Sequence, residues 1–252
     1  MSFDVAPHVA YVFILVFSRI GTMVMLMPAL GEVSVSARVR LTFAVVLSVL
    51  MLPLVENAYA PMSSNMGGVS WAIISEIFVG LFVGGAARLI MSALQVAGTV
   101  IAFQTGLAFA QNVDPTQGVQ SALFGSFLSI LSVTMIFATD LHFLLIGAIR
   151  DSYVLFKPGE VLPLGDFVEM AVATVGGAFQ LGVQIAAPFL VFGLIFYLAL
   201  GILAKLMPQV QIFFVAMPAN ILLGFALFAV LMGALVTWFL TFFEQTMGRF
   251  LA

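Results

Sequence analysis

The chain has no cysteine and few charged residues for its length. Of its 252 residues, 8% are charged and 63% are hydrophobic. The absence of cysteine excludes disulfides, thiolate metal sites and thiol nucleophiles. A soluble domain carries about 25% charged residues, so this chain lacks the polar side chains to cover a surface that faces water. We therefore expect lipid, partner proteins or both to surround it.

Basic residues and histidines are also scarce. The chain has 8 Lys and Arg against 11 Asp and Glu, and its two histidines, His8 and His142, lie far apart. Without a basic run, no nucleic-acid surface is expected. No Ser-His-Asp set can be assembled, and no glycine-rich loop precedes a lysine to bind phosphates. These absences favour a protein that is not an enzyme and that uses no cofactor and no metal.

Long apolar runs predict an all-α, polytopic membrane protein. A span needs roughly 20 apolar residues, and six blocks are candidates: residues 9–30, 39–55, 71–111, 122–149, 170–203 and 219–243. The N-terminus lacks the basic region and cleavage site of a signal peptide, so the first block is expected to remain as a span. As one helix, the third block would be roughly 60 Å long, so it must break near Gly98 or Gly106 or leave the bilayer. We expect Pro188 to kink the fifth block.

Local patterns give limited information on orientation and packing. Arg38 and Arg40, between the first two blocks, favour a cytoplasmic loop. Basic residues that would orient the later blocks are few, which suggests that partners help to position the chain. Gly80 and Gly84 form a GxxxG pair, which lets two helices approach closely.

Four ionisable residues lie in or near the apolar blocks. Arg19, Glu76, Arg88 and Asp140 either form a proton or ion relay, or reach an interface or pair with a neighbouring subunit. We favour the second interpretation. His142 has no titratable group one helical turn away, so a structural role is favoured over proton transfer.

Two further groups are ambiguous. Gln180 and Gln184 are four residues apart, so they either line a water-filled lumen or bond to a neighbouring helix. Met23, Met25 and Met27 fill core gaps or contact lipid, as methionine does on irregular surfaces.

One segment does not fit either a span or a simple loop. Residues 103–121 read FQTGLAFAQNVDPTQGVQS and contain no lysine or arginine. The segment is too polar for a lipid-facing span and lacks the basic residues usual in a cytoplasmic loop. Asp114 and Pro115 break helical continuity. From these residues alone, an external loop between two spans is the favoured interpretation.

Three stretches together resemble a known family. They read FSRIGTMVMLMPALGEVSVSARVRL, GLAFAQNVDPTQG and PFLVFGLIFYLALGILAKLMPQVQIFFVAMPANILLG. The chain resembles, over nearly its whole length, the FliR family of flagellar biosynthetic proteins, whose injectisome counterpart is SctT. The matching residues are Arg19, Pro28, Arg38, Asp114, Pro115, Pro188, Leu198, Leu200, Gly201, Pro208, Gln209, Ile212, Phe213, Pro218 and Gly224. Ser36 and Tyr197 depart from the Pro and the frequent Asn expected there.

The resemblance implies a subunit of the flagellar type III protein export gate in the bacterial inner membrane, within the flagellar basal body. Its implied partners are FliP-like, FliQ-like and FlhB-like subunits, and its cargo is unfolded protein. The chain would be a single domain over residues 1–252. Residues 1–165 would form a FliP-like part with a pore-plug loop at 103–121, and residues 166–252 a FliQ-like helical hairpin.

The resemblance also implies roles for individual residues. The plug would include Phe103, Gln104, Gly106, Leu107, Phe109, Gln111, Asn112, Asp114 and Pro115. Packing or assembly would involve the matching residues Arg19, Pro28, Arg38, Pro188, Gly201, Pro208, Gln209 and Pro218, together with Gly80 and Gly84 of the GxxxG pair. Pore water would satisfy the polar groups of the segment, which lipid could not, while Phe103, Leu107 and Phe109 would seal by apolar contact.

Two alternatives stay open at this stage. The first is the export gate of a virulence injectisome, which differs in its cargo. The second is a small-solute secondary transporter, because broken helices and polar residues within the membrane fit that class as well. The absence of charge between residues 170 and 204 counts against a transporter.

Overall fold

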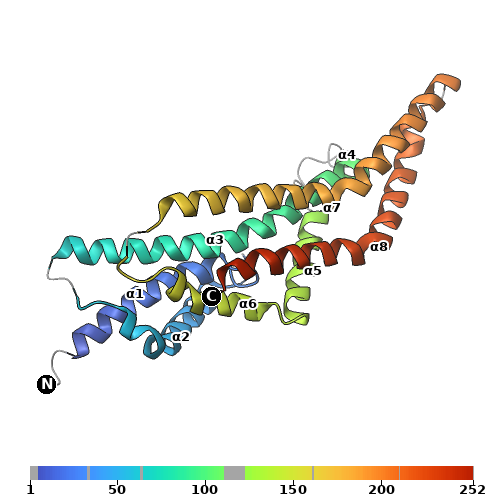
Figure 1. Cartoon of the computed structure of the whole chain (residues 1–252). Coiled ribbons are helices and arrows are strands. Elements are labelled where there is room, and N and C mark those ends of the chain that lie inside the picture. The colour runs from blue at the N-terminus through green and yellow to red at the C-terminus, as the bar shows by residue number, and fades with distance from the viewer. Residues whose placement is uncertain are drawn as a thin grey trace. The chain divides into compact units, whose positions relative to one another are not determined.

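The computed structural model is helical in all its long segments. It describes residues 5–32, 35–62, 65–110, 123–160, 162–209 and 211–251. The helices (Figure 1) are α1 (Val5–Leu26), α2 (Ala37–Val55), α3 (Met66–Gln104), α4 (Leu107–Ala110), α5 (Leu123–Ala138), α6 (His142–Leu155), α7 (Leu164–Leu206) and α8 (Ile212–Met247). In this described part, five helices are long and apolar enough to span a membrane, or six if α5 and α6 form one broken span. The predicted all-α, polytopic class is therefore confirmed.

The helix boundaries confirm one expectation for the predicted blocks and correct two others. The third block breaks at Gly106, the second of the two expected positions. The fourth block was predicted as one segment but forms two helices, and Asp140 at the break has a left-handed φ of 60°, which ends regular helical bonding. The last helix begins at Ile212 rather than after Pro218. Pro218 is the seventh residue of α8 and removes one intrahelical hydrogen bond, while the apolar residues before it still form the first turns of the helix.

The chain folds into two compact units, each built from separate stretches. Unit 1 comprises Met1–Ile90, Phe137–Val175 and Phe243–Ala252, and unit 2 comprises Met91–Ile136 and Gly176–Phe242. Both ends of the chain belong to unit 1. The two units are described separately below.

In unit 1, α2 packs on α1, and Figure 1 shows the two helices near each other. The contact face of α2 is a narrow stripe. The buried residues of α2 are Ala44, Ser48, Met51 and Val55. They alternate in steps of four and three, the spacing that keeps one helix seam against a partner. The remaining faces of α2 carry exposed apolar side chains, such as Leu50 and Leu54.

Unit 1 also contains a close contact between α1 and the first part of α3. A Cβ built on Gly80 would meet Thr22 Oγ1 and would lie 2.5 Å from the Arg19 carbonyl oxygen. A Cβ on Gly84 would lie 3.0 Å from Met23 Cα. The two glycines therefore face α1, and their missing side chains let the two backbones approach.

Aromatic rings join the last residues of the chain to unit 1. Phe82 of α3 contacts Phe156, Phe167 and Phe250, with ring centroids 6.1, 4.3 and 5.8 Å away. The rings meet edge to face, which is a favourable arrangement for aromatic pairs. Phe250 is 2% exposed, so the C-terminal turn is part of this core.

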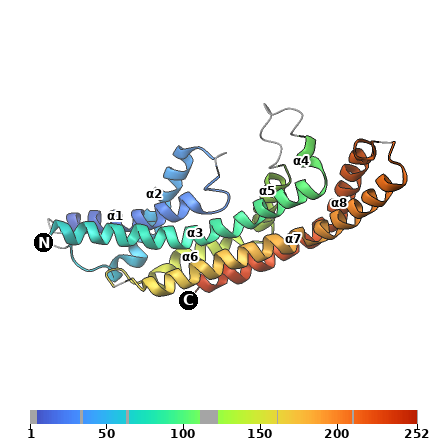
Figure 2. The ribbon, with the colours of Figure 1, turned by 90° about the horizontal axis from the view of Figure 1, so that it is seen from above.

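Unit 2 is organised around an antiparallel hairpin of α7 and α8 (Figure 2). Near the connecting turn, Asn220 Nδ2 of α8 lies 3.5 Å from the Tyr197 hydroxyl of α7. Further along, the rings of Phe189 and Phe228 are 6.2 Å apart. From the first contact to the second, the residue on α7 moves back along the chain and the residue on α8 moves forward. The two helices are therefore antiparallel.

The end of α3 and α5 complete unit 2. A Cβ on Gly98 of α3 would collide with Gly125 of α5, and Gln95 Nε2 donates to Ser129 Oγ at 2.9 Å. Phe124 then lies against Phe228 of α8, with centroids 4.9 Å apart. Small residues therefore seat α5 on α3, and aromatic rings join α5 to the hairpin.

Burial is unequal among the long helices. In their most apolar stretches, 56% of the residues of α3 are buried, against 22% in α2, 22% in α7 and 17% in α8. Three helices thus leave most of their apolar surface for lipid or for other proteins.

We predict that Gly80→Ala destabilises unit 1. The added methyl group would collide with Thr22 and with the backbone of α1, and overpacking of this kind costs about 1–3 kcal/mol. Gly85→Ala is the matched control, because nothing lies within 4 Å of its Cβ position. Thermal denaturation of the two purified variants in detergent should show a lower midpoint for Gly80→Ala alone. Equal midpoints would contradict the close α1–α3 contact.

Candidate functional site

The polar segment begins at a tight turn after α3. Thr105 and Gly106 connect α3 to the short helix α4, and the Gly106 N–H donates to the Phe103 carbonyl oxygen at 3.2 Å. Gly106 has a φ of 76°, a left-handed value that glycine adopts without steric cost. We call residues 104–106 the root of the segment.

The root packs against α7 and α8 at two glycines, Gly193 and Gly224. A Cβ on Gly193 of α7 would lie 2.9 Å from Gln104 Cδ. Thr105 is fully buried, and a Cβ on Gly224 of α8 would lie 2.7 Å from Thr105 Cβ. Two glycines on two helices thus provide the space that the root occupies.

Asn220 of α8 completes the contact. It is 3% exposed, and its Nδ2 donates to the Gln104 carbonyl oxygen at 3.3 Å. A Cβ on Gly106 would lie 2.9 Å from the same nitrogen. Carbonyl groups at the end of a helix lack intrahelical donors, so the amide of Asn220 satisfies one of them. Its Oδ1 is buried without a hydrogen-bond partner.

The structure describes about half of the predicted plug residues. Phe103 is 57% exposed, while Gln104 and Leu107 are partly buried and Gly106 is buried. Phe109 lies in α4. Outside the described residues lie Gln111, Asn112, Asp114 and Pro115. The plug role of these residues stays a prediction.

The predicted packing or assembly residues of unit 1 have different surroundings. Arg19 is 1% exposed, and Gly80 and Gly84 face α1. Pro28 is buried in the turn after α1, whereas Arg38 is exposed in the first turn of α2. Their roles in assembly are untested.

The corresponding residues of unit 2 are less buried. Pro188 and Gly201 lie inside α7, and Pro218 lies inside α8. Pro208 and Gln209 are exposed in the turn between these helices. Nothing lies within 4 Å of a Cβ on Gly201, so this position is open in the single chain.

A buried ion pair lies in unit 1. Arg19 Nε donates to Glu76 Oε2, and Arg19 Nη2 donates to Glu76 Oε1 at 3.1 Å. Arg19 Nη1 donates to the Ser152 carbonyl oxygen at 2.9 Å, and its guanidinium carbon lies 4.3 Å from the centroid of the Tyr153 ring. Glu76 is 2% exposed. The two charges therefore neutralise each other within the chain, a pairing that the sequence analysis did not identify.

Two tyrosines border this ion pair. The hydroxyl groups of Tyr59 and Tyr153 are buried, and their rings meet edge to face with centroids 6.4 Å apart. Tyr59 and Glu76 both line a cavity of about 160 Å³, which is large enough for water. Burial, and then the nearby Glu76 carboxylate, raise the pKa of the Tyr59 hydroxyl well above its ordinary value, so this hydroxyl is neutral.

The other ionisable residues are not gathered around that pair. Arg88 Nη1 contacts Glu32 Oε1 at 2.9 Å on the surface of unit 1. Asp140 is exposed at the break before α6. His142 stacks on Phe137 with ring centroids 5.1 Å apart. Among the described residues, no three of His, Cys, Asp or Glu are grouped as metal ligands.

The ambiguous residues are partly resolved. Met23 is fully buried and Met27 is 3% exposed, while Met25 is 39% exposed. Gln180 and Gln184 are both exposed on α7. Two methionines thus belong to the core, and the two interpretations of the glutamines remain open.

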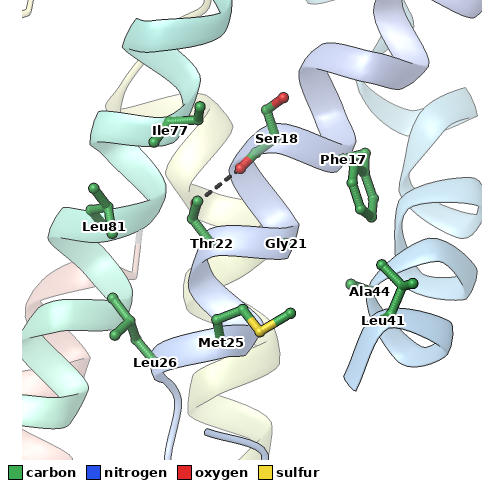
Figure 3. Close-up of a pocket in the computed structure, with 10 residues that line it drawn as sticks. All are labelled: Phe17, Ser18, Gly21, Thr22, Met25, Leu26, Leu41, Ala44, Ile77 and Leu81. Carbon is green, nitrogen blue, oxygen red and sulfur yellow. Dashed lines mark hydrogen bonds between the residues drawn. The ribbon is translucent and has the colours of Figure 1, made fainter. Parts of the chain in front are cut away.

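An open apolar groove of about 380 Å³ lies between α1, α2 and the first part of α3 (Figure 3). Its wall includes Phe17, Leu41 and Leu81, and Figure 3 shows Thr22 bonded back to the Ser18 carbonyl oxygen, at 2.9 Å. The polar groups at the groove are therefore satisfied within α1. The groove suits an apolar chain or side chain and offers nothing that would bind a polar solute.

Sequence reasoning missed the residues that hold the root. Thr105, Gly193 and Asn220 were not singled out as site residues, and Gly224 was noted only as a matching residue. An asparagine within an apolar helix is a usable signal, because a buried amide needs a partner. The identity of that partner depends on which helix lies opposite.

These features define a polytopic membrane protein with internally paired charges and an anchored polar segment. The family model of bacterial export proteins, family 1, matches residues 10–246. The chain is 44% identical over 229 residues to the flagellar biosynthetic protein FliR of Caulobacter vibrioides, covering 90% of this chain and 91% of that protein. It is 31% identical to FliR of Pectobacterium carotovorum over 82% of this chain and 79% of that protein. It is 30% identical to FliR of Bacillus subtilis over 88% of this chain and 86% of that protein. The chain therefore belongs to the FliR family of bacterial export proteins.

We predict that Glu76→Gln strongly destabilises the protein. The change leaves the buried Arg19 charge unpaired, which costs about 3–5 kcal/mol. Glu32→Gln removes the same charge from the exposed pair with Arg88 and should cost at most about 1 kcal/mol. Thermal denaturation and the membrane level of each variant would measure the difference. A Glu76→Gln protein as stable as Glu32→Gln would show that the buried pair is not needed for the fold.

Proposed function

We propose that the protein is a non-enzymatic subunit of the flagellar type III protein export gate in the bacterial inner membrane, where it forms part of the export pore and its plug. The observation that carries this proposal is membership of the FliR family over nearly the whole chain. The contacts of the root support the plug in particular. Residues 104–106 are held against α7 and α8, and the polar residues of the segment follow the short apolar helix α4.

The chemistry of residues 103–121 fits a closure within an aqueous pore. The segment is polar but contains no lysine or arginine. Water in a pore would satisfy its amides, and lipid would not. Phe103, which is 57% exposed, supplies an apolar surface that suits a reversible seal, because apolar contact is non-directional. Phe109 and the residues from Gln111 to Pro115 would complete it.

Poorly buried helices support assembly with other subunits. α2, α7 and α8 expose most of their apolar residues, so they need lipid or protein cover. FliP-like and FliQ-like subunits would cover part of this surface, with an FlhB-like subunit nearby in the flagellar basal body. We retain the division into a FliP-like part, 1–165, and a FliQ-like hairpin, 166–252, as part of the proposal.

The flagellar gate is favoured over the two alternatives. The relatives compared above are named flagellar biosynthetic proteins, which favours flagellar over injectisome cargo. A solute transporter would need polar groups that converge on a substrate. Arg19 and Glu76 instead engage each other, and the apolar groove between α1, α2 and α3 offers no polar partner.

We predict that deletion of the gene abolishes export of flagellar hook and filament proteins, and that the wild-type gene restores it. The protein purified in mild detergent should be recovered with FliP-like and FliQ-like subunits, because its exposed helices need cover. Mass spectrometry of the purified complex and immunoblots of the culture medium would measure both results. Normal export after deletion, or a stable lone monomer from native membranes, would contradict the proposed function.

Shortening the polar segment between Gly106 and Gln117 should open the resting pore. We predict an increased leak of small ions from reconstituted vesicles, while the complex elutes at its normal size. The reason is that residues of the plug are removed while the root and the helices stay intact. The control is the wild-type complex at the same protein-to-lipid ratio. Wild-type leak in the shortened, correctly assembled complex would rule out a sealing role for the segment.

A further inference from the structure

The amide of Asn220 is an unusual group for its position in the fold. It lies in a helix that is otherwise apolar around it, at 3% exposure. A buried amide costs free energy unless it is bonded. The acceptor half of this amide is unused, because Oδ1 is buried without a hydrogen-bond partner. A leucine would fill a similar volume without this cost, so packing alone does not explain an asparagine here.

What the amide does is hold the root. Its Nδ2 lies 3.3 Å from the Gln104 carbonyl oxygen and 3.5 Å from the Tyr197 hydroxyl. The same nitrogen lies 2.9 Å from the Cβ position of Gly106. One side chain thus contacts the end of α3, the left-handed turn and α7, all within unit 2.

Close packing makes the position of the root depend on the hairpin. Gln104 fills the space over Gly193 of α7, and Thr105 fills the space over Gly224 of α8. Neither helix of the hairpin can shift along the other without disturbing one of these contacts. The hydrogen bond from the Asn220 side-chain amide to the Gln104 carbonyl oxygen adds a directional contact to this close packing, and directional contacts select one geometry.

We propose that Asn220 is a positioning residue for the plug: it fixes the root to the α7–α8 hairpin in the closed pore, and a displacement of the hairpin releases the root. This inference rests on the proposed export-gate function. It adds a specific residue and a direction of coupling, from the hairpin through the root to the polar segment.

The first test compares Asn220→Leu with Thr237→Val. Both changes remove a polar group from α8, but Thr237 is exposed and its hydroxyl donates only within its own helix, to the Gly233 carbonyl oxygen at 2.9 Å. For assembled complexes in vesicles, Asn220→Leu should raise the resting ion leak roughly three- to tenfold, the factor expected for one lost hydrogen bond. Thr237→Val should leave it unchanged. Wild-type leak for Asn220→Leu in an assembled complex would overturn the proposal.

A second test keeps the proposal falsifiable if Asn220→Leu fails to assemble. Since the chain has no cysteine, Gln104→Cys and Gly193→Cys can be combined without background thiols from this subunit. The Cβ position of Gly193 lies 3.5 Å from Gln104 Cβ, within the range of a disulfide, roughly 3.5–4.5 Å. Oxidation of the double variant should block cargo export in membrane vesicles, and reduction should restore it. The control is Gln104→Cys alone, which leaves Gly193 unchanged and should export to the same extent with and without oxidant.

Export that continues through the fully oxidised double variant would show that the root does not move, and would overturn the proposal. This outcome is distinct from failure of the proposed function, in which deletion of the whole gene leaves export intact. Blocked export that recovers on reduction supports the proposal even if the leak measurement cannot be made on Asn220→Leu.

Discussion

In an apolar environment, charges and backbone polar groups have no water to bond to, so they must find partners within the protein. Helices satisfy the backbone internally. Arg19 and Glu76 form an ion pair, and the third guanidinium nitrogen of Arg19, Nη1, donates to the Ser152 carbonyl oxygen. This contact joins α1, α3 and α6 in unit 1. Removal of either charge would leave the other buried and unpaired, so the packing of three helices depends on one ion pair.

The same constraint acts where α3 ends. The last carbonyl groups of α3 have no intrahelical donors beyond the Gly106 turn. The side-chain amide of Asn220 donates to one of these carbonyl oxygens, that of Gln104. In unit 1 the three guanidinium nitrogens of Arg19 and both carboxylate oxygens of Glu76 are hydrogen-bonded. In unit 2 the amide of Asn220 keeps an unpaired oxygen. Local departures from full satisfaction tend to occur at functional sites, and this one lies at the base of the proposed plug.

Small residues decide where helices come close. Gly80 and Gly84 admit α1, Gly98 and Gly125 bring α3 and α5 together, and Gly193 and Gly224 receive the root. Only the first pair has the GxxxG spacing that sequence reasoning uses. The other glycines act across different helices, so their effect depends on which helices become neighbours. Meanwhile the outer faces of α2, α7 and α8 remain apolar and exposed, which is consistent with a subunit that is completed by others.

Composition and hydrophobic run length by themselves determined the membrane class and the long apolar helices, because runs of roughly 20 apolar residues fit a span and a helix satisfies its backbone groups internally. The polarity of residues 103–121 also identified the unusual segment from the sequence, since its composition suits neither lipid nor a basic cytoplasmic loop. Tertiary structure alone decided that Arg19 pairs with Glu76, that Gly106 is the break in the third block, and that Asn220 holds the root. These partners are 57 and 116 positions apart in the chain, and residues that distant meet only through the packing of several helices.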